Sequence, residues 1–189
     1  MEVSLRALIT ALHGMGFGAL YLLAGSGAVV ALYRKRSVGT QDANAHGEVR
    51  FLAIYLSAMA LLAWLTVLSG TYVIYPWYRA VPPAGAANLV AFSRALLLSR
   101  PETKQWHLIG MEWKEHVAWI VPIAITMAAA VVVKYGHDLR NHRQLRSAVL
   151  GFVAVSLAAA GIAGFFGAML NKNAPVEGGK TFHLAQGDK

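Results

Sequence analysis

Four long apolar stretches, separated by polar loops, dominate the chain. They cover residues 5–33, 51–75, 111–135 and 147–170, and most charged side chains lie at their ends or between them. A helix that crosses a lipid bilayer needs about 20 apolar residues, so each stretch is long enough. The pattern predicts an all-α polytopic membrane protein whose four transmembrane helices form an antiparallel bundle. We assign this transmembrane domain to residues 1–170 and a polar C-terminal tail to residues 171–189.

The loop between the second and third stretches is the longest. Apolar side chains recur in it at helical spacing, namely at Leu89, Phe92 and Leu96. We therefore predict a short interfacial helix over residues 87–98 in this loop. The following Ser99-Arg100-Pro101-Glu102 has the pattern of a capping box, so a new helix is expected to begin there and to continue into the third stretch. Pro122 predicts a kink within that helix.

The composition agrees with a membrane protein and narrows its chemistry. Hydrophobic residues make up 57% of the chain and charged residues 14%, against about 25% charged in soluble domains. There is no cysteine. Disulfides, thiolate-held iron–sulfur or zinc sites and the attachment of c-type haem are therefore excluded. A redox centre in this chain would need histidine or methionine ligands.

The basic residues predict orientation rather than nucleic-acid binding. The formal net charge is +8, but Lys and Arg lie beside the apolar stretches, where they bind anionic lipid headgroups. The first and third loops are short, and each contains four Lys or Arg residues. The positive-inside rule then places these loops in the cytoplasm. We expect a multi-pass protein of the inner (plasma) membrane with both termini on the periplasmic side. Met1-Glu2-Val3 lacks the basic residues of a secretory signal, so the first stretch is expected to be retained.

Histidines in the apolar stretches are the main candidates for chemistry. His13 lies in the first stretch and His116 near the start of the third. Ionisable side chains inside a membrane are costly and usually serve a function. With both helices entering from the outer face, the two imidazoles can meet across the bundle and hold a b-type haem. His107 lies nine residues before His116, which is half a rotation and about 13 Å along a helix, so it is the reserve partner for His13.

Other residues fit this cytochrome b-like site. Gly16 and Gly70 can leave room for a flat haem beside His13, and Arg79 can pair with the haem propionates. Glu112 and His116 are four residues apart, so both can face one metal ion, with His13 as a third ligand for zinc, copper or non-haem iron. Plainer interpretations are also open: a buried histidine can hydrogen-bond a neighbouring helix, and glycines can serve helix packing.

The predicted function is that of a small membrane subunit of an electron-transfer complex, respiratory or photosynthetic. It would bind haem b between the first and third helices near the outer face and exchange electrons with quinol. A bound quinone is a further candidate, and the expected partners are other membrane subunits and lipid. The alternative is a haem-free accessory or structural subunit of a multi-subunit membrane complex. A non-catalytic subunit is favoured over an enzyme acting alone.

Overall fold

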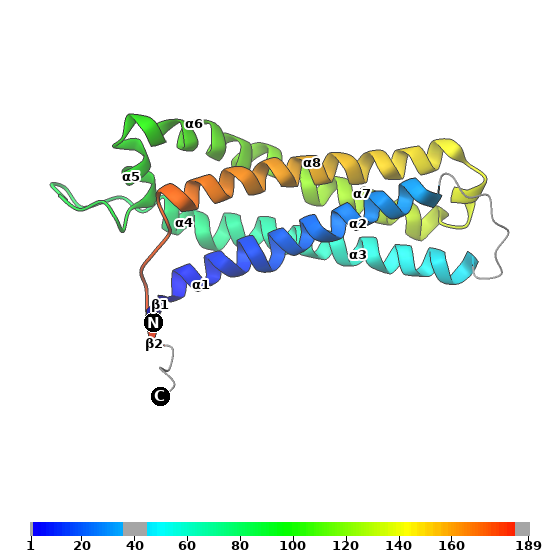
Figure 1. The fold of residues 1–189 in the computed structure, drawn as a ribbon, viewed down its shortest axis with the longest axis horizontal. Helices are drawn as coiled ribbons and strands as arrows, with labels where there is room; N and C mark the ends of the chain where they lie inside the picture. Colours follow the sequence, from blue (N-terminus) through cyan, green and yellow to red (C-terminus); the bar gives the residue numbers. More distant parts are fainter. Residues whose placement is uncertain (1, 36–44, 184–189) are drawn as a thin grey trace.

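Long helices lying side by side make up the computed structural model of this protein, which describes residues 2–35 and 45–183 (Figure 1). The first run contains α1 (Leu5–Ala11), the π-helical η1 (Leu12–Ala19) and α2 (Leu20–Lys35). The second contains α3 (Ala45–Ser69), the π-helical η2 (Gly70–Ile74) and α4 (Tyr75–Tyr78). A short helix, α5 (Ser93–Leu98), follows in the long loop.

The third run is interrupted and the fourth is continuous. The third contains α6 (Pro101–His116), the 3₁₀ turn η3 (Val117–Trp119) and α7 (Ile120–Tyr135). A second 3₁₀ turn, η4 (Asp138–Arg140), leads into α8 (Arg143–Asn173). The two short strands are β1 (Glu2–Ser4) and β2 (Thr181–His183). Apart from this strand pair, the described regular structure is helical.

The prediction of four long apolar helices is confirmed. Four helices are long and apolar enough to cross a membrane, namely Leu5–Tyr33, Gly47–Tyr78, Pro101–Tyr135 and Arg143–Asn173. The third exceeds its predicted apolar stretch most, because a polar helix, α6, precedes α7. The short helix predicted over residues 87–98 is present only as α5.

One local prediction about the third helix is corrected, and the kink at Pro122 stays a prediction. The N-cap of α6 is Arg100 rather than Ser99, whose hydroxyl instead donates a hydrogen bond to the Leu96 carbonyl at 2.8 Å. The helix changes hydrogen-bonding pattern at η3, just before Pro122. Because Pro122 has no N–H to donate to the carbonyl of Ala118, four residues earlier, it fits this interruption of the α-helical pattern.

The main core lies among α2, α3, α7 and α8. Its fully buried side chains include Leu56, Ile125, Val132 and Val153. A smaller apolar cluster lies at the other end of the molecule, the end that carries α5, α6 and both strands, which we call the α6 end (Figure 1). This cluster contains Tyr78, Leu97, Met111, Leu170, Ala174 and Val176.

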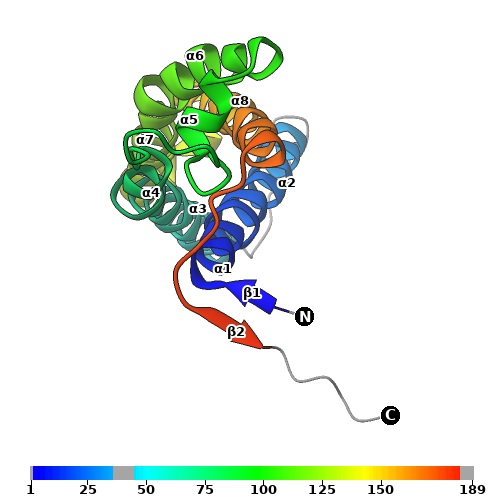
Figure 2. The same ribbon diagram turned by 90° about the vertical axis from the view of Figure 1, so that its left-hand side faces the viewer.

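The segment after α8 folds back over the α6 end (Figure 2). Ala174 and Val176 are buried, and the Ser93 hydroxyl donates a hydrogen bond to the Pro175 carbonyl at 3.0 Å. Further along, β2 pairs with β1 in antiparallel register, with Val3 opposite Phe182. The described part of the predicted polar tail is thus packed against α5 and the N-terminal strand.

Two hydrogen bonds, which we call the polar relay, join α2, α7 and α8 inside the main core through Tyr21, Ser156 and Val121. The buried Ser156 hydroxyl donates a hydrogen bond to the Val121 carbonyl of α7 at 2.8 Å. Tyr21 of α2 also hydrogen-bonds the Ser156 oxygen. Because serine has one hydroxyl proton, Tyr21 is the donor in that second bond.

Replacing Ser156 with alanine should lower the free energy of unfolding by about 1–2 kcal/mol, because the buried Tyr21 hydroxyl then loses its acceptor. The matched control is Ser147→Ala, an exposed serine of the same helix. Unfolding of both variants in mild detergent measures the difference. Equal stability of the two variants would contradict a stabilising role for the relay.

Candidate functional site

Two π-helical segments meet where His13 contacts the second helical run. His13 lies in η1, and its partners Ser69 and Gly70 lie at the junction between α3 and η2. A Cβ atom on Gly70 would lie 2.8 Å from Cε1 of His13. Gly70 therefore makes room for the His13 ring itself. Because π-helical turns are rare and often occur at functional sites, this junction is the first candidate site.

The hydrogen bonds of His13 fix its tautomer. Nδ1 of His13 lies 3.0 Å from the Ser69 hydroxyl oxygen. Ser69 donates its one hydroxyl proton to the Thr66 carbonyl at 3.1 Å. The Ser69 oxygen must therefore accept from the Nδ1–H of His13. Nε2 is left with its lone pair, which is the form in which a histidine ligates a metal.

Lys114 approaches His13 from α6. The ammonium nitrogen of Lys114 lies 2.9 Å from the position that a Cβ on Gly167 of α8 would occupy. It is also close enough to His13 for an electrostatic interaction. The absence of a side chain at Gly167 thus lets a cation point inward beside His13.

His107 lies nearer the start of α6 and is held by Tyr78. Its Nδ1 lies 2.6 Å from the hydroxyl of Tyr78, and the two ring centroids are 5.9 Å apart. Tyr78 is buried in the apolar cluster of the α6 end. The inward face of α6 therefore carries both His107 and, two turns later, Lys114.

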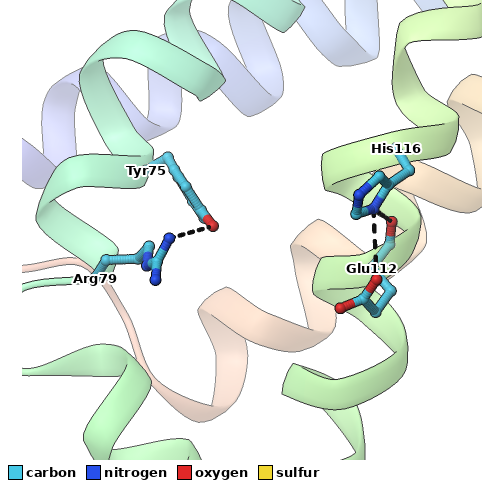
Figure 3. Close-up of polar contacts among 4 residues, drawn as sticks. All are labelled: Tyr75, Arg79, Glu112 and His116. Carbon is cyan, nitrogen blue, oxygen red and sulfur yellow. Dashed lines mark hydrogen bonds and ion pairs between the residues drawn. The ribbon is translucent and has the colours of Figure 1, made fainter.

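His116 and Glu112 form a second pair on α6 (Figure 3). Nδ1 of His116 lies 3.1 Å from the Glu112 carbonyl oxygen and 3.4 Å from its carboxylate. The side chains of His116 and Glu112 are 69% and 74% exposed. A carbonyl can only accept, so Nδ1 of His116 is protonated and Nε2 is available for a ligand.

Arg79 lies across from this pair in Figure 3 and contacts its own helix. Its Nη1 donates a hydrogen bond to the Tyr75 hydroxyl at 3.2 Å, and its guanidinium lies 5.4 Å from the Tyr75 ring centroid. Gly16 is also occupied locally, since a Cβ there would lie 2.8 Å from Cδ1 of Leu12. Neither residue contacts His13 through a recorded interaction in the described structure.

The structure thus brings together some candidate residues and leaves others apart. His13 lies against Gly70, and His116 against Glu112. In the described ranges no hydrogen bond or ring contact joins His13 to His116, and no group of three His, Asp, Glu or Cys residues could hold a metal ion. Lys114 and His116 are separated by about 200° on a helix, so their side chains leave α6 in different directions.

Comparison with protein-family models found no match, and neither did comparisons with curated proteins and with solved structures. The function is therefore inferred from the residues of this chain.

The contact between His13 and Gly70 makes a specific prediction. Gly70→Ala should displace the His13 ring and lower the free energy of unfolding by about 1–3 kcal/mol, because the added methyl group overpacks the junction. Gly151→Ala is the control, because a Cβ at Gly151 meets nothing within 4 Å. It should leave stability unchanged or raise it by up to about 1 kcal/mol.

Thermal unfolding measures the stability, and nitrogen NMR of labelled histidine reports the His13 tautomer. Gly70→Ala with wild-type stability and an unchanged His13 signal would show that the ring does not need the space at Gly70.

Proposed function

We propose that the four long helices insert into the plasma membrane as an antiparallel bundle. Four helices of sufficient length and apolarity support this. The strand pair brings both described ends of the chain to the α6 end, and the turn between α7 and α8 lies at the opposite end (Figure 1). The short, basic loops would face the cytoplasm and anionic lipid, and the α6 end would face the periplasm.

We further propose that the protein is a small subunit of a respiratory or photosynthetic electron-transfer complex and binds haem b at the α6 end. The observation that carries this is the His13–Ser69–Thr66 chain of hydrogen bonds, which leaves Nε2 of His13 unprotonated. Histidines that ligate metals usually hydrogen-bond through the other ring nitrogen in this way. His13 is therefore the proposed first axial ligand.

His116 is the proposed second ligand, and His107 is the reserve. The bond from Nδ1 of His116 to the Glu112 carbonyl prepares its Nε2 for iron in the same manner. Because its side chain leaves α6 about 200° from that of Lys114, α6 would have to rotate about its own axis to bring Nε2 of His116 toward His13. The His116 side chain itself is 69% exposed, so little packing holds it in place. His107 already faces inward, but it is held by Tyr78 and lies farther along the axis of α6.

When bound, the haem supplies one-electron chemistry. The chain would hold the iron through histidine and would exclude water with the cluster formed by α5 and the folded-back C-terminal segment. Arg79 would pair with a propionate in place of its present partner Tyr75. Quinol and other membrane subunits are the proposed electron donor and acceptors. Quinone binding belongs to this same proposal.

Haem binding is tested by purifying the protein from cells supplied with a haem precursor. We expect a Soret band at about one haem per chain in the wild type. His13→Ala should lose the band, because the first ligand is removed. The control is His142→Ala, at an exposed position between η4 and α8. His142→Ala should retain the band.

The second ligand is identified by the same spectrum. Loss of the low-spin signature in His116→Ala, with His107→Ala unchanged, supports His116 as the second ligand. The reverse pattern assigns His107. A wild-type protein without pigment would overturn the haem proposal.

That pigment-free outcome would favour a haem-free accessory subunit. The observation behind this alternative is that the His13–Ser69 hydrogen bond already joins the first two helical runs without any cofactor. His13→Ala would then lower stability and the assembly of partner subunits, with no spectroscopic change. Purification with associated membrane subunits separates this outcome from a failure to fold.

Orientation is tested with single cysteines, since the chain has none of its own. Glu177→Cys and Asn141→Cys are exposed positions near opposite ends of the molecule. A membrane-impermeant maleimide should label residue 177 in intact cells and residue 141 only after permeabilisation. The opposite result would reverse the proposed topology.

A further inference from the structure

Lys114 is the inward-pointing charge that the proposed ligand set does not use. It lies on a helix long and apolar enough to cross a membrane, its ammonium lies against Gly167 of α8, and its charge interacts with that of the His13 ring. Within the described ranges its ammonium has no recorded hydrogen bond or ion pair. An ammonium in such a position is costly unless an anion accompanies it.

Gly167 of α8 leaves room for the Lys114 ammonium. A side chain at Gly167 would meet the ammonium, since a Cβ there would lie 2.9 Å from Nζ. The neighbouring Met111 is buried in the apolar cluster, and the nearby His13 offers a lone pair rather than a charge. The neighbouring Glu115 hydrogen-bonds Tyr75, and no carboxylate is recorded as a partner of Lys114 in the described residues.

We propose that Lys114 binds an oxyanion carried by a molecule that lies beside His13. This inference rests on the proposed function when the oxyanion is a propionate of the haem. A haem held through His13 would bring carboxylates toward Lys114, whose charge interacts with His13. An anionic phospholipid phosphate is the other source of the same chemistry.

Lys114 fits this role better than Arg79. The Arg79 guanidinium already donates to Tyr75 and stacks over its ring. Lys114 could bind an anion without giving up a recorded hydrogen bond. A charge-assisted hydrogen bond of this kind typically changes affinity about tenfold or more.

The test compares haem with its dimethyl ester, which lacks the propionate charges, in reconstituted wild-type, Lys114→Gln, Lys114→Arg and Lys104→Gln proteins. Esterification should weaken binding about tenfold more in the wild type than in Lys114→Gln, where only the proposed pairing with Arg79 remains. Lys114→Arg should keep the penalty. Lys104 is an exposed lysine of the same helix, so Lys104→Gln should keep it too.

Other outcomes are distinguishable. An equal ester penalty in wild type and Lys114→Gln, with haem bound to both, would overturn the propionate assignment. If the wild type binds no haem, the proposed function fails, and native mass spectrometry in phosphatidylglycerol nanodiscs decides the remaining question. Phosphatidylglycerol retained by the wild type and lost in Lys114→Gln supports the lipid phosphate as the oxyanion. Equal retention in both proteins would overturn the site.

Discussion

The hydrogen bond between His13 and Ser69 is the constraint on which the α6 end depends. It joins the first and second helical runs at the point where both change to π-helical hydrogen bonding. The Ser69 hydroxyl donates its proton in a hydrogen bond to the Thr66 carbonyl, so in the contact with His13 the Ser69 oxygen can only accept. The His13 tautomer follows from this direction. Gly70 then follows from the ring position, because a Cβ there would occupy the same space as the imidazole. One polar contact thus accounts for a glycine and a protonation state.

Polar groups without hydrogen-bond partners are distributed unevenly along the molecule, and their position indicates where a ligand would bind. The main core is largely aliphatic, and its polar relay through Ser156 is internally satisfied. At the α6 end, by contrast, neither the Lys114 ammonium nor Nε2 of His13 has a recorded hydrogen bond in the described chain. α5 and the C-terminal segment close this end with apolar side chains, including Leu97 and Val176. Unsatisfied polar groups under such an apolar cover suit a bound molecule better than bulk water.

The apolar pattern predicted the four long helices because length and hydrophobicity act over about 20 residues. It did not predict the folded-back C-terminal segment, since burial of Val176 and the pairing of β2 depend on contacts between distant parts of the chain. Ser99 had the local pattern of an N-cap, but its hydroxyl is used by α5. The π-helical junction carries no sequence pattern of its own. Helical geometry, however, places Lys114 two turns after His107 and therefore on the same face of α6. It also places His116 about 200° away from Lys114. The sequence alone could thus have assigned Lys114 to the inward face once His107 was placed there.

The two unsatisfied groups beside each other narrow the class of molecule that could occupy this end. Nε2 of His13 offers an electron pair, so it requires a Lewis acid or a hydrogen-bond donor. Lys114 offers a cation, so it requires an anion. A phospholipid phosphate meets the second requirement and leaves His13 unchanged, whereas a free metal ion meets the first and is repelled by the ammonium. An iron porphyrin with carboxylates on its edge meets both at once, because its Lewis acid and its anions are held apart by a rigid apolar plate. That complementarity, rather than the count of histidines, is why we propose haem rather than a simple metal ion.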